Sequence, residues 1–205
     1  NPEEFTIDHI RQADVCIEFS TPHTAFNHVK KCLEAGVPTI CGSTAWLQNL
    51  EEAQAICLQY QTAFLYASNF SIGVNLFFKI NKMVASIMNA HPEYAVSMEE
   101  IHHTQKKDSP SGTAVTLAEG ILANYPHKTK WVNEISQHKQ DLSIISKRID
   151  PAPGTHSIHY DSDIDSIELK HTAHSRKGFA SGALLAAEFV VGKKGLFSMD
   201  DVLEI

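Results

Sequence analysis

The 205-residue sequence has no long hydrophobic run and no excess of basic residues. No stretch of about 18 consecutive apolar residues occurs, so we expect no transmembrane helix, and we expect no signal peptide. Lys and Arg together number 17 against 24 Asp and Glu, a formal net charge of −7 at pH 7. Because phosphate backbones are bound by basic faces, we expect neither a nucleic-acid nor a membrane partner.

Cysteine is scarce and is not arranged for metal binding or for a disulfide framework. Cys16, Cys32, Cys41 and Cys57 show no C-x-x-C spacing, and each lies in an apolar stretch. We therefore expect reduced, buried thiols in a cytoplasmic protein. The sequence also lacks internal repeats and low-complexity tracts, and its 43% hydrophobic content is ordinary for a globular protein with a substantial core.

Strand and helix patterns alternate through the first third of the sequence. Apolar runs predict buried strands at residues 13–19, 37–41 and 63–67. Helical patterns lie between them at residues 20–36 and 45–60, the first opening with Ser-Thr-Pro, a hydroxyl cap followed by proline. Strands joined by short helical connections predict βαβ units, and hence an α/β fold with a parallel sheet.

The carboxyl ends of the three predicted strands carry candidate ligand contacts, because open parallel sheets bind ligands there. These ends are Phe19–Thr21, Gly42–Thr44 and Ala67–Phe70, all small, polar or accessible at the backbone. The placement favours a nucleotide groove. A Gly-Ser-Thr turn after a strand is common in such folds, however, and alone carries little weight.

The second half of the sequence predicts a different kind of sheet. Its expected elements are a long helix at 73–90, strands at 94–101, 142–148, 155–160 and 166–172, and helices ending near Asn124, at 179–191 and after a cap at Ser198. Residues 125–140 are expected to be irregular. The strands have polar residues on one face, which predicts an open antiparallel or mixed sheet. Sheets of this kind often form oligomer interfaces.

The stretch 99–119 carries most of the chemically active side chains. Two histidines, two lysines and an aspartate precede a Pro-Ser-Gly-Thr turn, after which a helical apolar stripe begins at Ala114. Ser111 is placed to cap this helix, and the amides of Gly112–Ala114 at its N-terminus suit a carboxylate or phosphate. We interpret the stretch as an anion site with proton carriers beside it. A solvated surface loop explains any one of these residues alone, whereas the whole set favours a site.

The same stretch resembles a known family signature. From Glu99 to Ala114 it reads Glu-x-x-His-His-x-x-Lys-x-Asp-x-Pro-Ser-Gly-Thr-Ala, which is similar to the motif of the 4-hydroxy-tetrahydrodipicolinate reductases, also called dihydrodipicolinate reductases. Further likeness in order and spacing covers nearly the whole chain, at Phe19–Pro22, Gly42–Thr44, Ser68–Asn75 and Ser175–Ala183.

This resemblance implies an enzyme that reduces 4-hydroxy-tetrahydrodipicolinate to tetrahydrodipicolinate with NADPH or NADH, in lysine and diaminopimelate biosynthesis. It implies a partial Rossmann-like dinucleotide-binding domain over residues 1–70 and a substrate-binding and oligomerisation domain with a mixed sheet over 71–177. Helices over 178–205 would return to the first domain. It also implies a homotetramer assembled through the sheets of the substrate domains.

The resemblance also implies roles for single residues. By match to the motif, His102 and Lys106 are the implied catalytic residues, and the sequence leaves open which of them delivers the proton that follows hydride transfer. The implied substrate-binding residues are His103, Ser111, Gly112 and Thr113. The implied cofactor-binding residues are Phe19, Gly42, Ser43, Thr44, Ala67, Ser68, Asn69 and Phe70. No metal is implied.

One family feature is missing from the 205 residues. The family begins with a strand and a turn of the form G-x-x-G-x-x-G, which binds the pyrophosphate, and a second strand whose end selects NAD or NADP. Roughly 40 residues, the size of such a portion, are absent. We expect this chain to bind cofactor poorly and to have impaired activity. Ordinary micromolar affinity for NADPH in isothermal titration would refute this expectation.

Two alternatives compete with this interpretation. His102 and His103 with Asp108 and either His171 or His174 would offer metal ligands, but adjacent residues of a strand point in opposite directions and chelate poorly. Metal analysis of the purified protein tests that alternative. The second is a non-catalytic ligand-binding or assembly module, because the glycine-rich turn is missing. A steady-state assay on the gene-length protein tests it.

Overall fold

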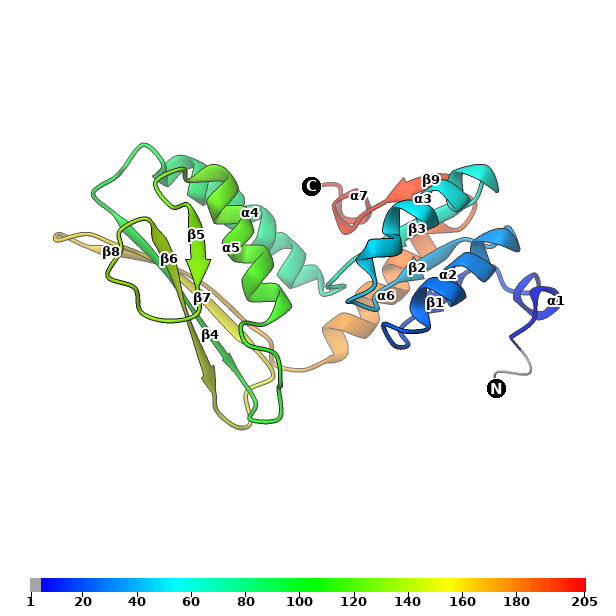
Figure 1. The fold of residues 1–205 in the computed structure, drawn as a ribbon, viewed down its shortest axis with the longest axis horizontal. Helices are drawn as coiled ribbons and strands as arrows, with labels where there is room; N and C mark the ends of the chain where they lie inside the picture. Colours follow the sequence, from blue (N-terminus) through cyan, green and yellow to red (C-terminus); the bar gives the residue numbers. More distant parts are fainter. Residues whose placement is uncertain (1–4) are drawn as a thin grey trace. The chain divides into compact units, whose positions relative to one another are not determined.

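The structure is a computed structural model that describes residues 5–205, and the chain folds into two compact units. The first unit combines residues 5–75 with Lys177–Ile205, and the second is Leu76–Arg176. Segments from the two ends of the sequence, blue and red in Figure 1, therefore share the first unit. Helix α4 (Ile72–Met88) leads the chain from the first unit into the second.

The first unit is a parallel sheet between two layers of helices. Its strands, in spatial order, are β1 (Cys16–Glu18), β2 (Thr39–Cys41), β3 (Ala63–Tyr66) and β9 (Gly195–Phe197). Its helices are α1 (Ile7–Ile10), α2 (Ala25–Glu34), α3 (Leu50–Gln59), α6 (Lys177–Val190) and α7 (Met199–Leu203). Cys41 and Phe64 pack with α2 and α3, whereas Ile40 and Leu65 pack with α6. Burial on both faces explains the continuous apolar runs of β2 and β3 and confirms the predicted architecture.

Several boundaries in this unit differ from the prediction. The expected buried strand at 13–19 shortens to three residues, and Ile17 is 47% exposed because β1 is the edge strand of the described sheet. Helix α2 begins at Ala25, later than expected, since the Ser20 hydroxyl bonds to Glu18 and Thr24 instead of capping the helix. Strand β9 was not expected, because three residues show no recognisable period.

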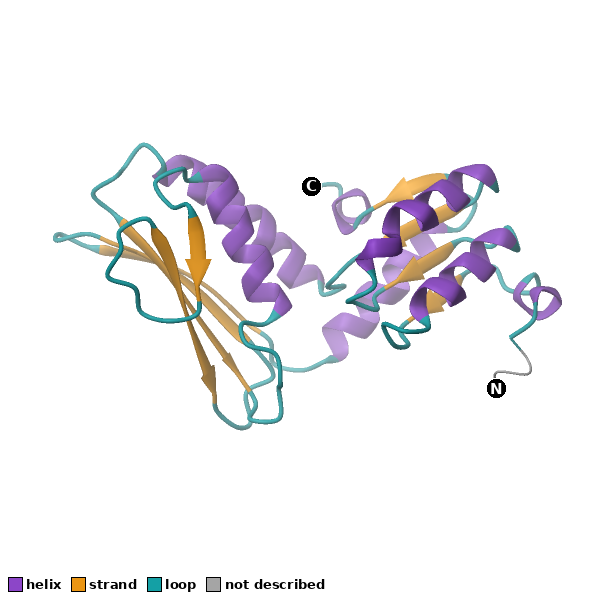
Figure 2. Cartoon of the chain, in the orientation of Figure 1, coloured by secondary structure: helices purple, strands orange, loops and turns teal. Residues whose placement is uncertain are grey.

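The second unit is a mixed sheet with its helices on one face. Its strands, in spatial order, are β5 (Lys130–Val132), β6 (Asp141–Arg148), β4 (Ala95–His102), β7 (Thr155–Asp161) and β8 (Ser166–Thr172). Strand β4 is parallel to β6 and antiparallel to β7. Helices α4 and α5 (Gly112–Asn124) cover the same face (Figure 2) and bury the core of this unit. The predicted mixed sheet is confirmed, and β5 is an addition within the stretch expected to be irregular.

Strand β4 determines which side chains reach the core of the second unit. Its burial alternates strictly, with Val96, Met98, Glu100 and His102 on the buried, helix-covered face. The first two are apolar and join the core, whereas the last two are polar. The buried positions of β4 therefore change from apolar to polar toward the end of the strand. The polar cluster that they form lies directly before the loop whose sequence resembles the reductase motif.

The four cysteines are free thiols, with Cys32, Cys41 and Cys57 buried and Cys16 partly exposed. The expectation of buried, reduced thiols therefore holds for three of them in the structure. Across residues 5–205, no helix combines the length and the apolar character needed to cross a membrane.

Candidate active site

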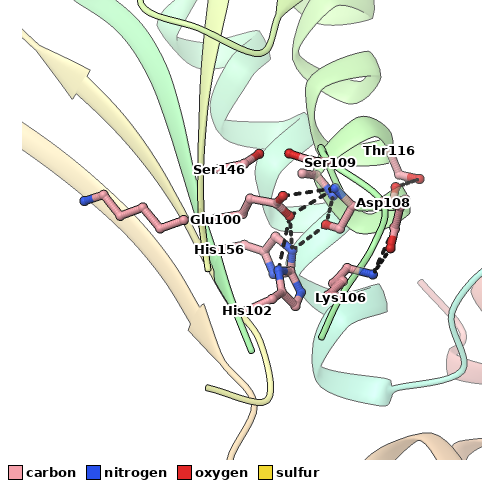
Figure 3. A network of polar contacts seen from close by, with 12 residues as sticks. Glu100, His102, Lys106, Asp108, Ser109, Thr116, Ser146 and His156 are labelled. Carbon is pink, nitrogen blue, oxygen red and sulfur yellow. Dashed lines mark hydrogen bonds and ion pairs between the residues drawn. The ribbon is translucent and has the colours of Figure 1, made fainter. Parts of the chain in front are cut away.

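His102 is the last residue of β4, so it belongs to the strand and not to the following loop. Its side chain is buried, with 7% of the residue exposed. The Nδ1 atom lies 3.3 Å from Oε2 of Glu100, an ion-pair contact that is not aligned as a hydrogen bond, and it has no other partner. The ring of His156 stands edge-on to the ring of His102, with centroids 5.0 Å apart. Figure 3 shows the three side chains converging.

Glu100 is the centre of this cluster and is fully buried. Its Oε1 accepts a hydrogen bond of 3.1 Å from the Arg148 guanidinium, and both carboxylate oxygens accept from the Ser111 N–H at 3.1 and 3.2 Å. The register explains the convergence, because Glu100 pairs with His156 of β7 and His102 pairs with Arg148 of β6. Neighbouring strands therefore present these side chains to one face of the sheet.

The surroundings set the charge states of two members of the cluster. Burial opposes ionisation of Glu100, but the contact with His102 and the hydrogen bond from Ser111 outweigh it and hold the pKa of that carboxyl well below its usual range. Burial, with His102 as a neighbouring like charge, lowers the pKa of His156 to about 3. Glu100 is therefore ionised and His156 neutral near pH 7.

The start of α5 has the predicted cap. The Ser111 Oγ accepts from the Ala114 N–H at 3.2 Å, and the helix begins at Gly112. Ser111 itself is 2% exposed, and its polar atoms contact Glu100, Ala114 and His156. Gly112 is exposed, and a Cβ added there would meet nothing within 4 Å. The backbone at Gly112 is thus open to an approaching anion, whereas Ser111 holds the helix start in place.

The loop between β4 and α5 carries Lys106 and His103. The Lys106 ammonium lies 2.8 and 2.9 Å from the two carboxylate oxygens of Asp108 (Figure 3). His103 Nε2 lies 3.3 Å from a guanidinium nitrogen of Arg176. His103 and Arg176 line a hollow of about 340 Å³ together with Asp150 and the turn that follows it. Two cationic groups, Lys106 and Arg176, therefore belong to the same unit as His102.

Gly154 lies beside the Nε2 edge of the His102 ring, whereas Glu100 contacts Nδ1. A Cβ at this position would lie 3.1 Å from His102 Nε2 and 3.3 Å from its Cδ2, tighter than ordinary contact. A residue without a side chain therefore avoids crowding this edge of the imidazole.

The predicted cofactor contacts come together at the strand ends of the first unit. The rings of Phe19 and Phe70 pack with centroids 5.3 Å apart. A Cβ at Gly42 would lie 2.2 Å from the Phe19 ring, and a Cβ at Gly182 of α6 would lie 1.8 Å from the Phe70 carbonyl oxygen. Glycine is therefore required at Gly182, where the clash is with backbone, whereas a side chain at Gly42 would displace the ring of Phe19, which is 53% exposed at this edge of the sheet.

The other predicted cofactor residues lie around this aromatic pair. Ser43 is buried and its carbonyl accepts from the Trp46 indole at 2.7 Å, whereas Thr44 is exposed. The Ala67 N–H donates to the Cys41 carbonyl, and Ser68 is exposed. Asn69 holds its own turn, because its Oδ1 accepts from the Ser71 N–H at 2.8 Å.

Four buried or half-buried charged and titratable residues were not identified from the sequence: Glu18, Glu100, Arg148 and His156. In the first unit, Glu18 accepts from the Ser20 N–H at 2.9 Å and from the Cys41 thiol at 3.1 Å. Burial raises the pKa of Glu18, but hydrogen bonds from Ser20 and its neighbours outweigh it, so the net shift is downward. In the second unit, the alternation of Val96 and Met98 was a usable signal, because it assigns Glu100 and His102 to the buried face.

Among residues 5–205, one cluster has the composition of a metal site, and it differs from the set considered from the sequence. Glu100, His102 and His156 offer ligand atoms within 4.8 Å of one another. Asp108 instead pairs with Lys106, and the ring of His171 packs against Phe77. The guanidinium of Arg148 on Glu100 supplies the positive charge that a divalent ion would otherwise supply, which disfavours a metal here.

These features define the class of the protein. A parallel βαβ unit with accessible strand ends, joined to a mixed-sheet unit with titratable groups beside a helix N-terminus, is the architecture of a dinucleotide-dependent oxidoreductase. Among solved structures of similar fold is an amine dehydrogenase from Mycobacterium smegmatis, with a TM-score of 0.57 and 9% identity over 93% of this chain and 77% of that chain. At that identity the likeness concerns the fold alone.

The particular family follows from closer comparisons. The family models for the N-terminus and the C-terminus of dihydrodipicolinate reductase match residues 4–70 and 73–203. A 4-hydroxy-tetrahydrodipicolinate reductase from Christiangramia forsetii is 46% identical over 94% of this chain and 80% of its own length. A dipicolinate-bound dihydrodipicolinate reductase from Paenisporosarcina has a TM-score of 0.74 and 28% identity over 97% of this chain and 76% of that chain. The chain belongs to the dihydrodipicolinate reductase family.

Proposed function

We propose that this protein reduces 4-hydroxy-tetrahydrodipicolinate to tetrahydrodipicolinate with NADPH or NADH, a step in lysine and diaminopimelate biosynthesis. Family membership and the name of the 46% identical relative support the reaction. The observation that carries the proposal is local. His102 and Lys106 lie on the segment that leads into the N-terminus of α5, which suits a carboxylate.

The substrate is a cyclic dicarboxylate, and the second unit offers two places for its charges. We assign one carboxylate to the amides of Gly112 and Thr113 at the start of α5, where the helix dipole favours an anion. The second carboxylate is assigned to His103 with Arg176, whose guanidinium suits a carboxylate geometrically. The solved relative named as bound to dipicolinate supports a small dicarboxylate ligand.

The chemistry requires a hydride and a proton. The nicotinamide supplies the hydride, and because the product lacks the 4-hydroxyl group, the overall reaction consumes one proton and releases water. His102 has an imidazole suited to proton transfer near neutral pH, and Lys106 has an ammonium that stabilises developing negative charge or donates the proton. Asp108 holds this ammonium at 2.8 Å, which orients the Lys106 side chain. We assign proton delivery to this pair, His102 and Lys106, and not to one of the two alone.

Residues at the strand ends of the first unit fit part of a dinucleotide site. Phe19 presents an exposed aromatic face, and Gly42 and Phe70 hold it in place. We assign Ser43, Thr44 and residues 67–70 to the same contact surface. The glycine-rich turn that binds pyrophosphate in the family is not among the 205 residues. We assign no preference between NADH and NADPH.

We also propose a homotetramer that works in the cytoplasm. The face of the mixed sheet opposite α4 and α5 has no covering layer among the described residues, and β8 exposes most of its side chains there, as an assembly surface would. Four free cysteines suit a reducing compartment. Light scattering coupled to size exclusion tests the assembly, and a monomer at micromolar concentration would refute it.

The test of the function is an oxidation assay with NADPH and, separately, NADH. The gene-length protein and the 205-residue chain are assayed side by side, with tetrahydrodipicolinate identified by mass spectrometry. We expect substrate-dependent turnover by the gene-length protein, and the assay of the 205-residue chain tests whether these residues suffice for it. Absence of product from the folded gene-length protein with either cofactor would contradict the proposal.

A further inference from the structure

The ion pair between Glu100 and Arg148 lies behind both proposed proton carriers. Glu100 is fully buried, and its contact with the guanidinium measures 3.1 Å. We propose that the two are positioning residues: Glu100 sets the orientation and the protonated nitrogen of His102, and Arg148 anchors both Glu100 and the loop that bears Lys106. This inference rests on the reductase activity proposed above.

The contact with Glu100 selects one tautomer of His102. Nδ1 of the ring faces Oε2 of Glu100 at 3.3 Å and has no other polar neighbour to pair with. An ionised carboxylate accepts hydrogen bonds and never donates them, so the proton of the neutral ring belongs on Nδ1. Nε2 then keeps its lone pair on the side of Gly154, a residue with no side chain of its own to crowd it. Held in this way, the ring takes up and returns a proton at Nε2 without rotating.

The charges around His102 are balanced for this task. Its side chain contacts Glu100 of β4 and His156 of β7, and His102 pairs in register with Arg148 of β6. The charge of Lys106 on the loop acts on His156 of the same cluster. The charges of Glu100 and Arg148 cancel, and His156 is neutral near pH 7. The carboxylate that supports His102 therefore stays ionised near pH 7.

Arg148 connects this cluster to the loop. The guanidinium nitrogen that contacts Glu100 also donates to the Asp108 carbonyl at 2.6 Å, and a second one donates to the Lys147 carbonyl at 2.9 Å. The Asp108 carboxylate in turn holds the Lys106 ammonium. A continuous chain of contacts thus joins the two proton carriers through one guanidinium (Figure 3 shows its Glu100, His102, Lys106 and Asp108 members). Loss of Arg148 should disturb both of them.

The same two strands supply a matched control. Glu99 and Lys147 precede Glu100 and Arg148 by one residue each and form an ion pair of 2.5 Å on the opposite face of the sheet. Lys147 is exposed and Glu99 is partly exposed. Substitutions in this pair remove the same kinds of charge from the same strands without touching the helix-covered face.

The kinetic test compares Glu100→Gln and Arg148→Met with Glu99→Gln and Lys147→Met in the gene-length protein, with light scattering used to select variants that keep the wild-type oligomeric state, because the control pair lies on the proposed assembly face. We expect the first two to lower kcat by about 10- to 100-fold with little change in KM for NADPH, and the control pair to stay within about twofold. Glu100→Gln should also move the alkaline limb of the kcat profile to lower pH, because the charge that stabilises an imidazolium is gone. Glu100→Asp, which keeps the charge, should leave that limb in place. Equal kcat and pH profiles for Glu100→Gln and Glu99→Gln, in folded proteins, would overturn the proposal.

A second measurement does not depend on turnover or on a stable variant. Long-range correlation of ring protons with nitrogen-15 distinguishes the two tautomers of a histidine in the unmodified protein. We expect His102 to carry its proton on Nδ1 above neutral pH. A proton on Nε2 would overturn the positioning role even if the reductase is active. If the protein is inactive but shows the Nδ1 tautomer, the proposed function fails while the assignment of the cluster stands. Stoichiometric zinc binding lost in His156→Gln would instead identify a metal site and would also overturn the proposal.

Discussion

Glu99 and Glu100 are neighbours on β4, and each pairs with a cation that β6 presents on its own side of the sheet. Glu99 pairs with Lys147 at 2.5 Å on the face that α4 and α5 leave open. Glu100 pairs with Arg148 at 3.1 Å on the face that they cover, where it also contacts His102 and the start of α5. Because side chains alternate along a strand, one step in sequence separates a surface ion pair from the centre of a polar network.

Comparison of the two ion pairs indicates that burial, and not contact distance, determines how much an ion pair affects stability. The shorter contact belongs to the exposed pair, in which solvent screens the attraction, and such pairs contribute about 0–1 kcal/mol. The buried pair has longer contacts but leaves an uncompensated charge when one member is removed, which costs roughly 3–5 kcal/mol. The buried pair also restricts the ring that we assign to proton transfer.

The largest expected effect is on stability. Arg148→Met should lower the free energy of unfolding by about 3 kcal/mol or more, because Glu100 would remain buried without its cation. Lys147→Met should change it by less than about 0.5 kcal/mol. Denaturant unfolding of both variants measures the difference. Equal losses of unfolding free energy in Arg148→Met and Lys147→Met would contradict the proposed difference between the buried and the exposed ion pair.

The next effect is on catalysis. His102→Gln and Lys106→Ala should each lower kcat by about 10²-fold or more, with cofactor binding intact, because each removes a proposed proton carrier. His159→Gln is the control, since that histidine lies on β7 with its side chain on the opposite face from His156. Steady-state assays and NADPH titration measure both quantities. Near-normal turnover in both site variants would refute the role assignment.

The pH dependence of stability sharpens the comparison further. The pKa of His156 lies at about 3 against an ordinary 6.5, so the unfolded chain binds a proton there first as the pH falls. Stability from this group is present above pH 6.5 and is lost between that pH and about 3, at up to about 1.4 kcal/mol per unit. His156→Gln should make the free energy of unfolding depend less steeply on pH in this range, whereas His159→Gln should leave that dependence unchanged. Denaturant unfolding at a series of pH values measures the slope, and an unchanged slope in His156→Gln would contradict the neutral assignment.

The smallest effect concerns access to His102. Gly154→Ala places a Cβ 3.1 Å from Nε2 of His102 at a residue whose φ of +157° L side chains rarely adopt, so the ring or the backbone must shift. We expect about a 10-fold lower kcat with KM little changed, because reacting groups tolerate displacement poorly. In the His102→Gln background the same substitution should add no further loss, as a double-mutant cycle would report. Additive losses would mean that Gly154 acts through another group.

The features predicted correctly are those recorded in local patterns. The parallel strands, the mixed sheet and the Ser111 cap each depend on a few consecutive residues, whose period and chemistry are visible without the fold. The two short strands β5 and β9 were missed because three residues carry no period. The late start of α2 depends on hydroxyl contacts among Ser20, Thr24 and Glu18, which compete with capping.

The buried network could be predicted only in part. The alternation along β4 was sufficient to place Glu100 beside His102 on the core face. Arg148 and His156 lie 48 and 56 residues beyond Glu100, and their convergence depends on the register of three strands. No local pattern records that register, so the partners that hold the proposed catalytic histidine emerge only from the fold.

A crystal structure of the gene-length protein with dipicolinate and oxidised cofactor tests the central claim most directly. The account predicts one carboxylate within hydrogen-bond distance of the Gly112 and Thr113 amides, with the ring of the ligand facing His102 Nε2 and the Lys106 ammonium. A dicarboxylate bound away from the start of α5, or His102 and Lys106 both directed away from it, would contradict the account.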